Sequence, residues 1–103
     1  MLIRVVAWLE LLKARELIVN QKVALSVHSA LESIRAAIDA APRNAYIAEL
    51  HLQIIKYAEV LNETTGKEFC EGVGIGGAFA TEFSKMRKIA KRLRDAGLDV
   101  NKI

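Results

Sequence analysis

Apolar residues recur along this chain at spacings of three and four, which is the period of an α-helix with one buried face. Two such stripes precede residue 42: Leu2, Val5, Val6, Leu9 and Leu12 form the first, and Val27, Leu31, Ile34, Ile38 and Ala41 form the second. Neither Gly nor Pro occurs in residues 1–41, so the pattern predicts helix throughout. It leaves open either one continuous helix or two helices that meet near Asn20, a residue able to cap a new helix.

Pro42 is expected to end this region and to fit the first turn of the next helix. That helix is predicted to end around Asn62, and its apolar stripe is Ile47, Leu50, Ile54, Ala58 and Leu61. The sequence Thr65-Gly66-Lys67-Glu68 has the spacing of a capping box, in which the Thr hydroxyl and the Glu carboxylate accept exposed amides at a helix start. A short helix is therefore predicted to begin at Thr65.

Four of the six glycines fall within residues 72–77. Each Gly costs a helix about 1 kcal/mol relative to Ala, so this stretch is predicted to be a turn. The helical period resumes from Ala78 to Ala96, with Gly97 as the expected C-cap. The inward positions of this last helix are Phe79, Phe83, Met86, Ala90 and Leu93. Residues 98–103 are predicted to be either frayed or a short strand.

Composition indicates one folded domain. A chain of 103 residues suits a single core, and an apolar fraction of 52% with 26% charged residues argues against extended disorder. A small domain this apolar is expected to bury some side chains in a homodimer or higher homo-oligomer. Its uncharged runs are far shorter than the ~20 residues that a membrane span requires. The single cysteine, Cys70, allows no internal disulfide, which favours a cytoplasmic location.

The charges are distributed unevenly along the chain. Residues 1–84 contain eight Lys and Arg against ten Asp and Glu, whereas residues 85–103 contain seven against two. The net charge of +3 therefore arises from the C-terminal part. Such asymmetry favours an acidic partner for this part, and nucleic acid is the commonest one.

Residues 69–83 combine several features of a helix-turn-helix. This motif needs a small residue where its helices cross, a Gly in the turn and a large apolar residue after it; Cys70, Gly74 and Ile75 meet these requirements. The other inward positions are Phe69, Val73, Ala80 and Phe83. Residues 65–98 thus resemble the helix-turn-helix of bacterial or phage transcription regulators, and residues 91–98 look like the end of a recognition helix in winged-helix regulators. The sequence departs from that pattern at Gly72, inside the first helix, and in having too few residues after Val100 for a full wing.

The resemblance implies that the helix from Ala78 lies in the major groove of DNA, with Thr81, Glu82, Ser84 and Lys85 near base edges. Its cations would neutralise phosphates. The predicted DNA-binding residues are Thr81, Ser84, Lys85, Arg87, Lys88, Lys91, Arg92 and Arg94. Within the single domain 1–103, residues 1–41 are then a packing and oligomerisation region, and residues 42–103 contain the helix-turn-helix-like region. The fold class expected is all-α, a small bundle of four to five helices.

The sequence offers little for other chemistry. His28 and His51 lie on different predicted helices without a second histidine at ligand spacing, and Cys70 has no neighbouring His, so no catalytic residue, metal or cofactor is predicted. We expect a non-enzymatic DNA-binding protein, either a transcriptional regulator or an accessory factor of a mobile element. One alternative is a helical adaptor or inhibitor that docks on a partner protein through Leu2, Val6 and Leu9. Another is a hydrolase with a Cys70 nucleophile; this alternative would be excluded if the Cys70 thiol were buried.

Overall fold

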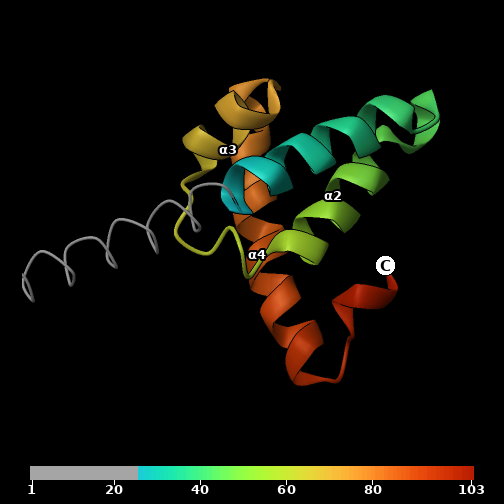
Figure 1. The fold of residues 1–103 in the computed structure, drawn as a ribbon, viewed down its shortest axis with the longest axis vertical. Coiled ribbons are helices and arrows are strands. Elements are labelled where there is room, and N and C mark those ends of the chain that lie inside the picture. Colours follow the sequence, from blue (N-terminus) through green and yellow to red (C-terminus); the bar gives the residue numbers. More distant parts are fainter. Residues whose placement is uncertain (1–25) are drawn as a thin grey trace, which may run out of the picture.

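The computed structural model describes residues 26–103, which are helical with no strand (Figure 1). Residues 26–40 lie in a helix, named helix 26–40 here, and three further α-helices follow: α2 (Tyr46–Tyr57), α3 (Gly66–Val73) and α4 (Ala80–Asp95). Short 3-10 helices are η1 (Arg43–Ala45), η2 (Gly77–Phe79) and η3 (Val100–Lys102). The prediction of an all-α bundle is confirmed. The first apolar stripe, and the choice between one helix and two, fall in residues 1–25, outside the described residues.

Helix 26–40 and α2 form an antiparallel hairpin, which turns at Pro42 and η1 (Figure 1). The two predicted stripes face each other in one core, because Ile34, Ile38, Leu50 and Ile54 are all almost completely buried there. The first turn of α2 differs from the prediction, since Ile47 is 45% exposed.

A neighbouring aromatic residue takes the place that was predicted for Ile47. Tyr46 packs against the core, with its ring centroid 6.3 Å from that of Phe79. The helix is also shorter than predicted, because α2 ends at Tyr57 and residues 58–63 form turns. Leu61 nevertheless stays fully buried, so the apolar stripe continues into these turns.

Two glycines allow α3 to pack closely against its neighbours. The prediction of a turn from residue 72 was wrong, because α3 continues to Val73. A Cβ atom at Gly72 would lie 2.5 Å from Leu31 Cδ1. The absence of a side chain at Gly72 therefore lets Leu31 of helix 26–40 pack directly against α3. At Gly66 a Cβ atom would lie 2.8 Å from Ala80 Cβ. At both positions a Cβ atom would lie less than 3.0 Å from a neighbouring side chain, so glycine permits the close contact although it lowers helix propensity.

The C-terminal segment ends differently from either predicted form. Gly97 has φ +106° just after α4, and the Leu98 N–H donates to the Leu93 carbonyl at 3.0 Å, which confirms the glycine-terminated helix end. Residues 100–102 then form η3, neither frayed nor a strand. Leu93 is 39% exposed rather than inward, because it lies in the last turn of α4, beyond the buried Ala90. Among residues 26–103 no helix is long and apolar enough to cross a membrane.

We predict that Gly66→Ala destabilises the protein by about 1–3 kcal/mol, because its Cβ would force the start of α3 away from Ala80. Gly76→Ala is the matched control. Nothing lies within 4 Å of a Cβ at Gly76, whose φ of −64° suits alanine, so this variant should be unchanged or up to about 1 kcal/mol more stable. Urea unfolding followed by circular dichroism measures both. Equal effects of the two substitutions would contradict a close α3–α4 contact.

Candidate nucleic-acid interface

The predicted capping box fixes the start of α3. Thr65 Oγ1 accepts the Glu68 N–H at 3.1 Å, and Glu68 Oε1 accepts the Thr65 N–H at 3.2 Å, so two otherwise exposed amides are satisfied. Hydrogen bonds from the Thr65 hydroxyl and from the Thr65 N–H to the carboxylate hold the pKa of Glu68 below its ordinary value. The capping-box prediction is confirmed.

The turn after α3 is closed by Gly74, as predicted. Gly74 has φ +83°, a left-handed conformation that favours glycine, and the Gly74 and Ile75 N–H groups both donate to the Cys70 carbonyl, at 2.9 and 3.0 Å. Arg35 of helix 26–40 adds a bond that the sequence did not reveal: its Nη1 donates to the Val73 carbonyl at 2.8 Å. The end of α3 is therefore tied to helix 26–40.

Aromatic stacking joins α3 to α4. The Phe69 and Phe83 rings are nearly parallel, at 11°, with centroids 4.3 Å apart, and both residues are fully buried. Cys70 and Val73 are buried beside them, while Ile75 and Ala80 are partly buried. The inward positions of the predicted helix-turn-helix-like unit are thus the ones that the structure buries.

One row of α4 side chains faces away from the core. The row, which we name the outer ridge, consists of Thr81, Lys85, Lys88 and Arg92, all exposed and spaced by four, three and four residues. This spacing places them on one line of the helix, opposite the buried Phe83 and Ala90. Ser84 and Lys91 are exposed next to this ridge. Six of the eight predicted DNA-binding residues are therefore open to solvent on α4.

The seventh, Arg87, points toward the turn that precedes α3. Its Nη1 donates to the carbonyls of Leu61, Asn62 and Thr64 at 3.0, 3.1 and 2.9 Å. The guanidinium also lies over the Phe83 ring, 4.4 Å from the ring centroid. Arg87 thus connects α4 to the 61–64 turn, a role that its place in a run of basic residues did not indicate.

The eighth residue, Arg94, and the acidic Glu82 connect α4 to the second helix and its following turn. Arg94 Nη1 lies 2.5 Å from Glu59 Oε1, and Glu82 Oε2 lies 2.8 Å from His51 Nε2. Glu82 was predicted to approach base edges, whereas the structure directs it to His51 at the side of the helix. Both contacts fix the position of α4 against α2 and the turn after it.

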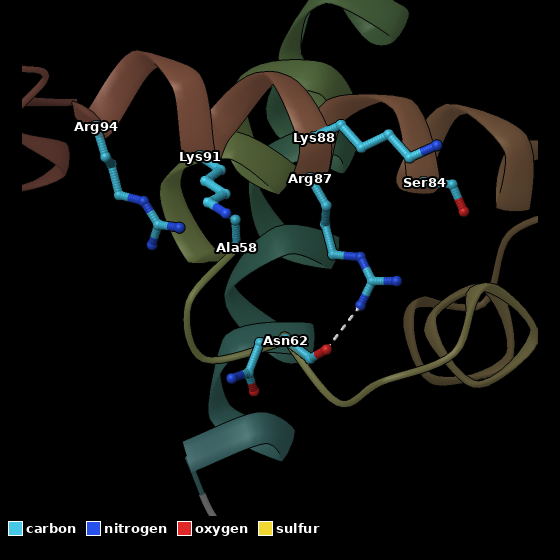
Figure 2. Close-up of a pocket in the computed structure, with 7 residues that line it drawn as sticks. All are labelled: Ala58, Asn62, Ser84, Arg87, Lys88, Lys91 and Arg94. Atoms are coloured by element: carbon cyan, nitrogen blue, oxygen red, sulfur yellow. Dashed lines mark hydrogen bonds between the residues drawn. The ribbon is translucent and has the colours of Figure 1, made fainter. Parts of the chain in front are cut away.

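A hollow of about 370 Å³ lies along one side of α4, between this helix and the turns that follow α2 (Figure 2). Five lining residues belong to α4, namely Ser84, Arg87, Lys88, Lys91 and Arg94. Arg87 extends from the helix toward Asn62, whereas Lys88 runs along the helix toward Ser84 (Figure 2). Ala58 and Asn62 form its opposite wall. None of the lining residues is acidic, so the hollow, named the basic groove here, has a strongly positive lining.

Cys70 does not have the properties of a nucleophile. Its side chain is 2% exposed, and burial raises the pKa of its thiol, so the reactive thiolate is disfavoured. The burial of this thiol argues against Cys70 as the nucleophile of a hydrolase. Within residues 26–103 no group of three or more His, Cys, Asp or Glu side chains is placed to hold a metal ion.

Comparison with known protein families connects this chain to a helix-turn-helix-like family. The model of a family described as an HTH-like domain matches residues 26–96, more than half of the chain, and the matched segment includes helix 26–40 as well as α2, α3 and α4. No curated protein and no solved structure matches this chain.

We predict that Arg87→Met destabilises the fold by about 2–3 kcal/mol, because the Leu61, Asn62 and Thr64 carbonyls lose a charged donor. Arg92→Met, which removes the same charge from the exposed outer ridge, should stay within about 0.5 kcal/mol of the parent. Thermal and urea unfolding give both values. Similar stability of the two variants would show that Arg87 does not hold the turn.

We also predict that Thr65→Ala lowers stability by about 1 kcal/mol at neutral pH through loss of the N-cap. The lowered pKa of Glu68 means that its carboxylate stabilises the folded state above the unfolded pKa of about 4.3 and that this contribution is lost as the pH falls through the folded pKa. Because the Thr65 hydroxyl is the largest cause of the lowered pKa and is lost in this variant, stability should become less dependent on pH below about 5. Urea unfolding at several pH values tests this; an acid limb identical to that of the parent would refute it.

Proposed function

We propose, from the premise that the chain belongs to the HTH-like domain family, that it is a non-enzymatic protein that binds double-stranded DNA through α4. The observation that carries this proposal is the outer ridge: Lys85, Lys88 and Arg92 are exposed on one line of α4. None of the three forms an ion pair with a carboxylate among residues 26–103. Their charge is therefore available to a polyanion.

The ridge suits the docking mode of a helix-turn-helix. In this mode the second helix enters the major groove with its first turns near the bases, while cations along it contact phosphates. On α4 this places Thr81 and Lys85 near base edges and Lys88 and Arg92 further along the backbone. Arg87, Arg94 and Glu82 hold the helix in place and do not contact base edges in this arrangement.

The biological role that we propose is transcriptional regulation or an accessory function in a bacterial or phage mobile element. Residues 1–25, with the apolar stripe from Leu2 to Leu12, would join two copies, so that each copy presents one α4 to a half-site. The free, buried thiol of Cys70 is compatible with the reducing cytoplasm that we propose as its location.

A protein-interaction module is the second candidate, favoured by the exposed apolar side chains of Ile89, Leu93 and Leu98 at the C-terminal end. The docking residues predicted from the sequence, Leu2, Val6 and Leu9, lie outside the described residues. This candidate requires no affinity for DNA, so the two functions are separated by one binding measurement.

The proposal predicts that the protein binds a random-sequence duplex with an affinity that falls log-linearly with salt concentration. Arg92→Gln should weaken binding and reduce the magnitude of the salt slope by about 1, because one phosphate contact is lost. Arg43→Gln is the matched control. It removes the same charge from an exposed residue of η1, in the turn between helix 26–40 and α2, and should bind as the parent does.

Fluorescence anisotropy with a labelled duplex across a salt series measures these affinities, and light scattering on the same samples gives the mass in solution. Absence of binding at low salt would favour the protein-interaction module. Equal effects of Arg92→Gln and Arg43→Gln would show that any binding depends on net charge and not on the outer ridge.

A further inference from the structure

The basic groove differs from the outer ridge in being a concave site that is lined from two sides, by α4 and by the turns after α2. Ser84 and Lys91 belong to the groove alone, whereas Lys88 lines the groove and is also a residue of the ridge. The groove is open on the solvent side, and its opposite wall is formed by Ala58 and Asn62. A ligand there would therefore contact α4 and the turns after α2 together.

The groove also has an excess of positive charge that the described residues do not neutralise. Of its four cations, only Arg94 has a carboxylate partner within residues 26–103, namely Glu59. The three hydrogen bonds of Arg87 go to neutral carbonyls and use Nη1 alone, so its charge is not cancelled. Such a cluster of like charges is unfavourable when empty and is relieved by a bound anion.

We propose that the basic groove binds a phosphate group. A phosphate offers several acceptor oxygens and one to two negative charges, which match the Ser84 hydroxyl, the Lys88 and Lys91 ammonium groups and the Arg87 guanidinium. A water molecule takes up about 30 Å³ in the liquid, so a hollow of about 370 Å³ has room for a hydrated phosphate group. An apolar ligand would leave these donors without partners.

The source of the phosphate that fits the position of the groove best is the DNA backbone, and this part of the proposal rests on the proposed function. A helix in the major groove has phosphates along both of its sides. One side of α4 has the basic groove, while the opposite side has the exposed, apolar Ile89 and Leu93. Of these two sides, the groove side has the donors for a backbone phosphate, and a phosphate held there would fix the orientation of α4 on the duplex.

The test uses two variants with the same charge change on the full-length chain. Lys91→Met alters the groove, and Lys85→Met alters the outer ridge; both residues are exposed, so both variants are expected to melt as the parent does. Each protein is titrated with inorganic phosphate against chloride at equal ionic strength, and amide chemical shifts are followed by NMR. Each is also titrated with a labelled duplex across a salt series.

In the parent and in Lys85→Met, we expect phosphate to change the amide chemical shifts of Ser84, Lys88, Lys91 and their neighbours. In Lys91→Met, we expect phosphate to leave these chemical shifts unchanged. We expect both variants to bind the duplex about tenfold more weakly than the parent, because each loses one charged contact. Phosphate shifts that persist in Lys91→Met, or that are absent from the parent, would overturn the groove as a phosphate site.

The remaining outcomes separate the two proposals. Loss of phosphate shifts in Lys91→Met with unchanged duplex affinity would support the groove but assign it to a free phosphorylated compound, which overturns the DNA backbone as the source. Phosphate shifts in a parent protein that does not bind the duplex would refute the proposed function and leave the groove standing. If the parent binds the duplex but phosphate changes none of its amide chemical shifts, the groove is refuted as a phosphate site and the proposed function stands.

Discussion

The arrangement of the C-terminal half depends on one side chain, Arg87. Its guanidinium donates to three carbonyls of the 61–64 turn, those of Leu61, Asn62 and Thr64. The turn leads directly into the capping box at Thr65, so the hydrogen bonds that hold it also set where α3 begins. The same guanidinium lies over Phe83, whose ring stacks on Phe69 of α3. Arg87 thus couples the polar and the aromatic contacts between α3 and α4.

This use of a cation in the architecture divides the basic residues of α4 into two groups. Arg87 and Arg94 point toward the body of the protein and are held by carbonyls or by Glu59. The outer ridge residues point away from it, with no carboxylate partner among the described residues. The helical period separates these groups, because positions 87 and 94 are seven residues apart and fall close to the buried line of Phe83 and Ala90. An arginine on the buried side contributes packing as well as charge, since the aliphatic part of its side chain covers apolar surface.

Much of the fold follows from local pattern, and the deviations come from tertiary contacts. The stripes around Ile34 and Ile54 predicted the core correctly, since burial of one helical face repeats every three or four residues. The capping box at Thr65 and the turn at Gly74 were also predicted, because their chemistry is contained in a few neighbouring residues. Gly72 was misassigned, since the reason for a glycine within α3 is the side chain of Leu31, forty-one positions earlier.

The predicted site shows the same division between local and distant causes. The exposed residues of α4 could be inferred from its period, but the partners of Arg87 and Arg94 lie twenty or more positions earlier and leave no signal near them in the sequence. These partners have a consequence for binding. Contacts of Glu82, Arg87 and Arg94 anchor the start, middle and end of α4, so the helix is presented as a preorganised element. Association with DNA would then order mainly the Lys and Arg side chains of α4 and not its backbone. The entropic cost of binding is lower for this reason.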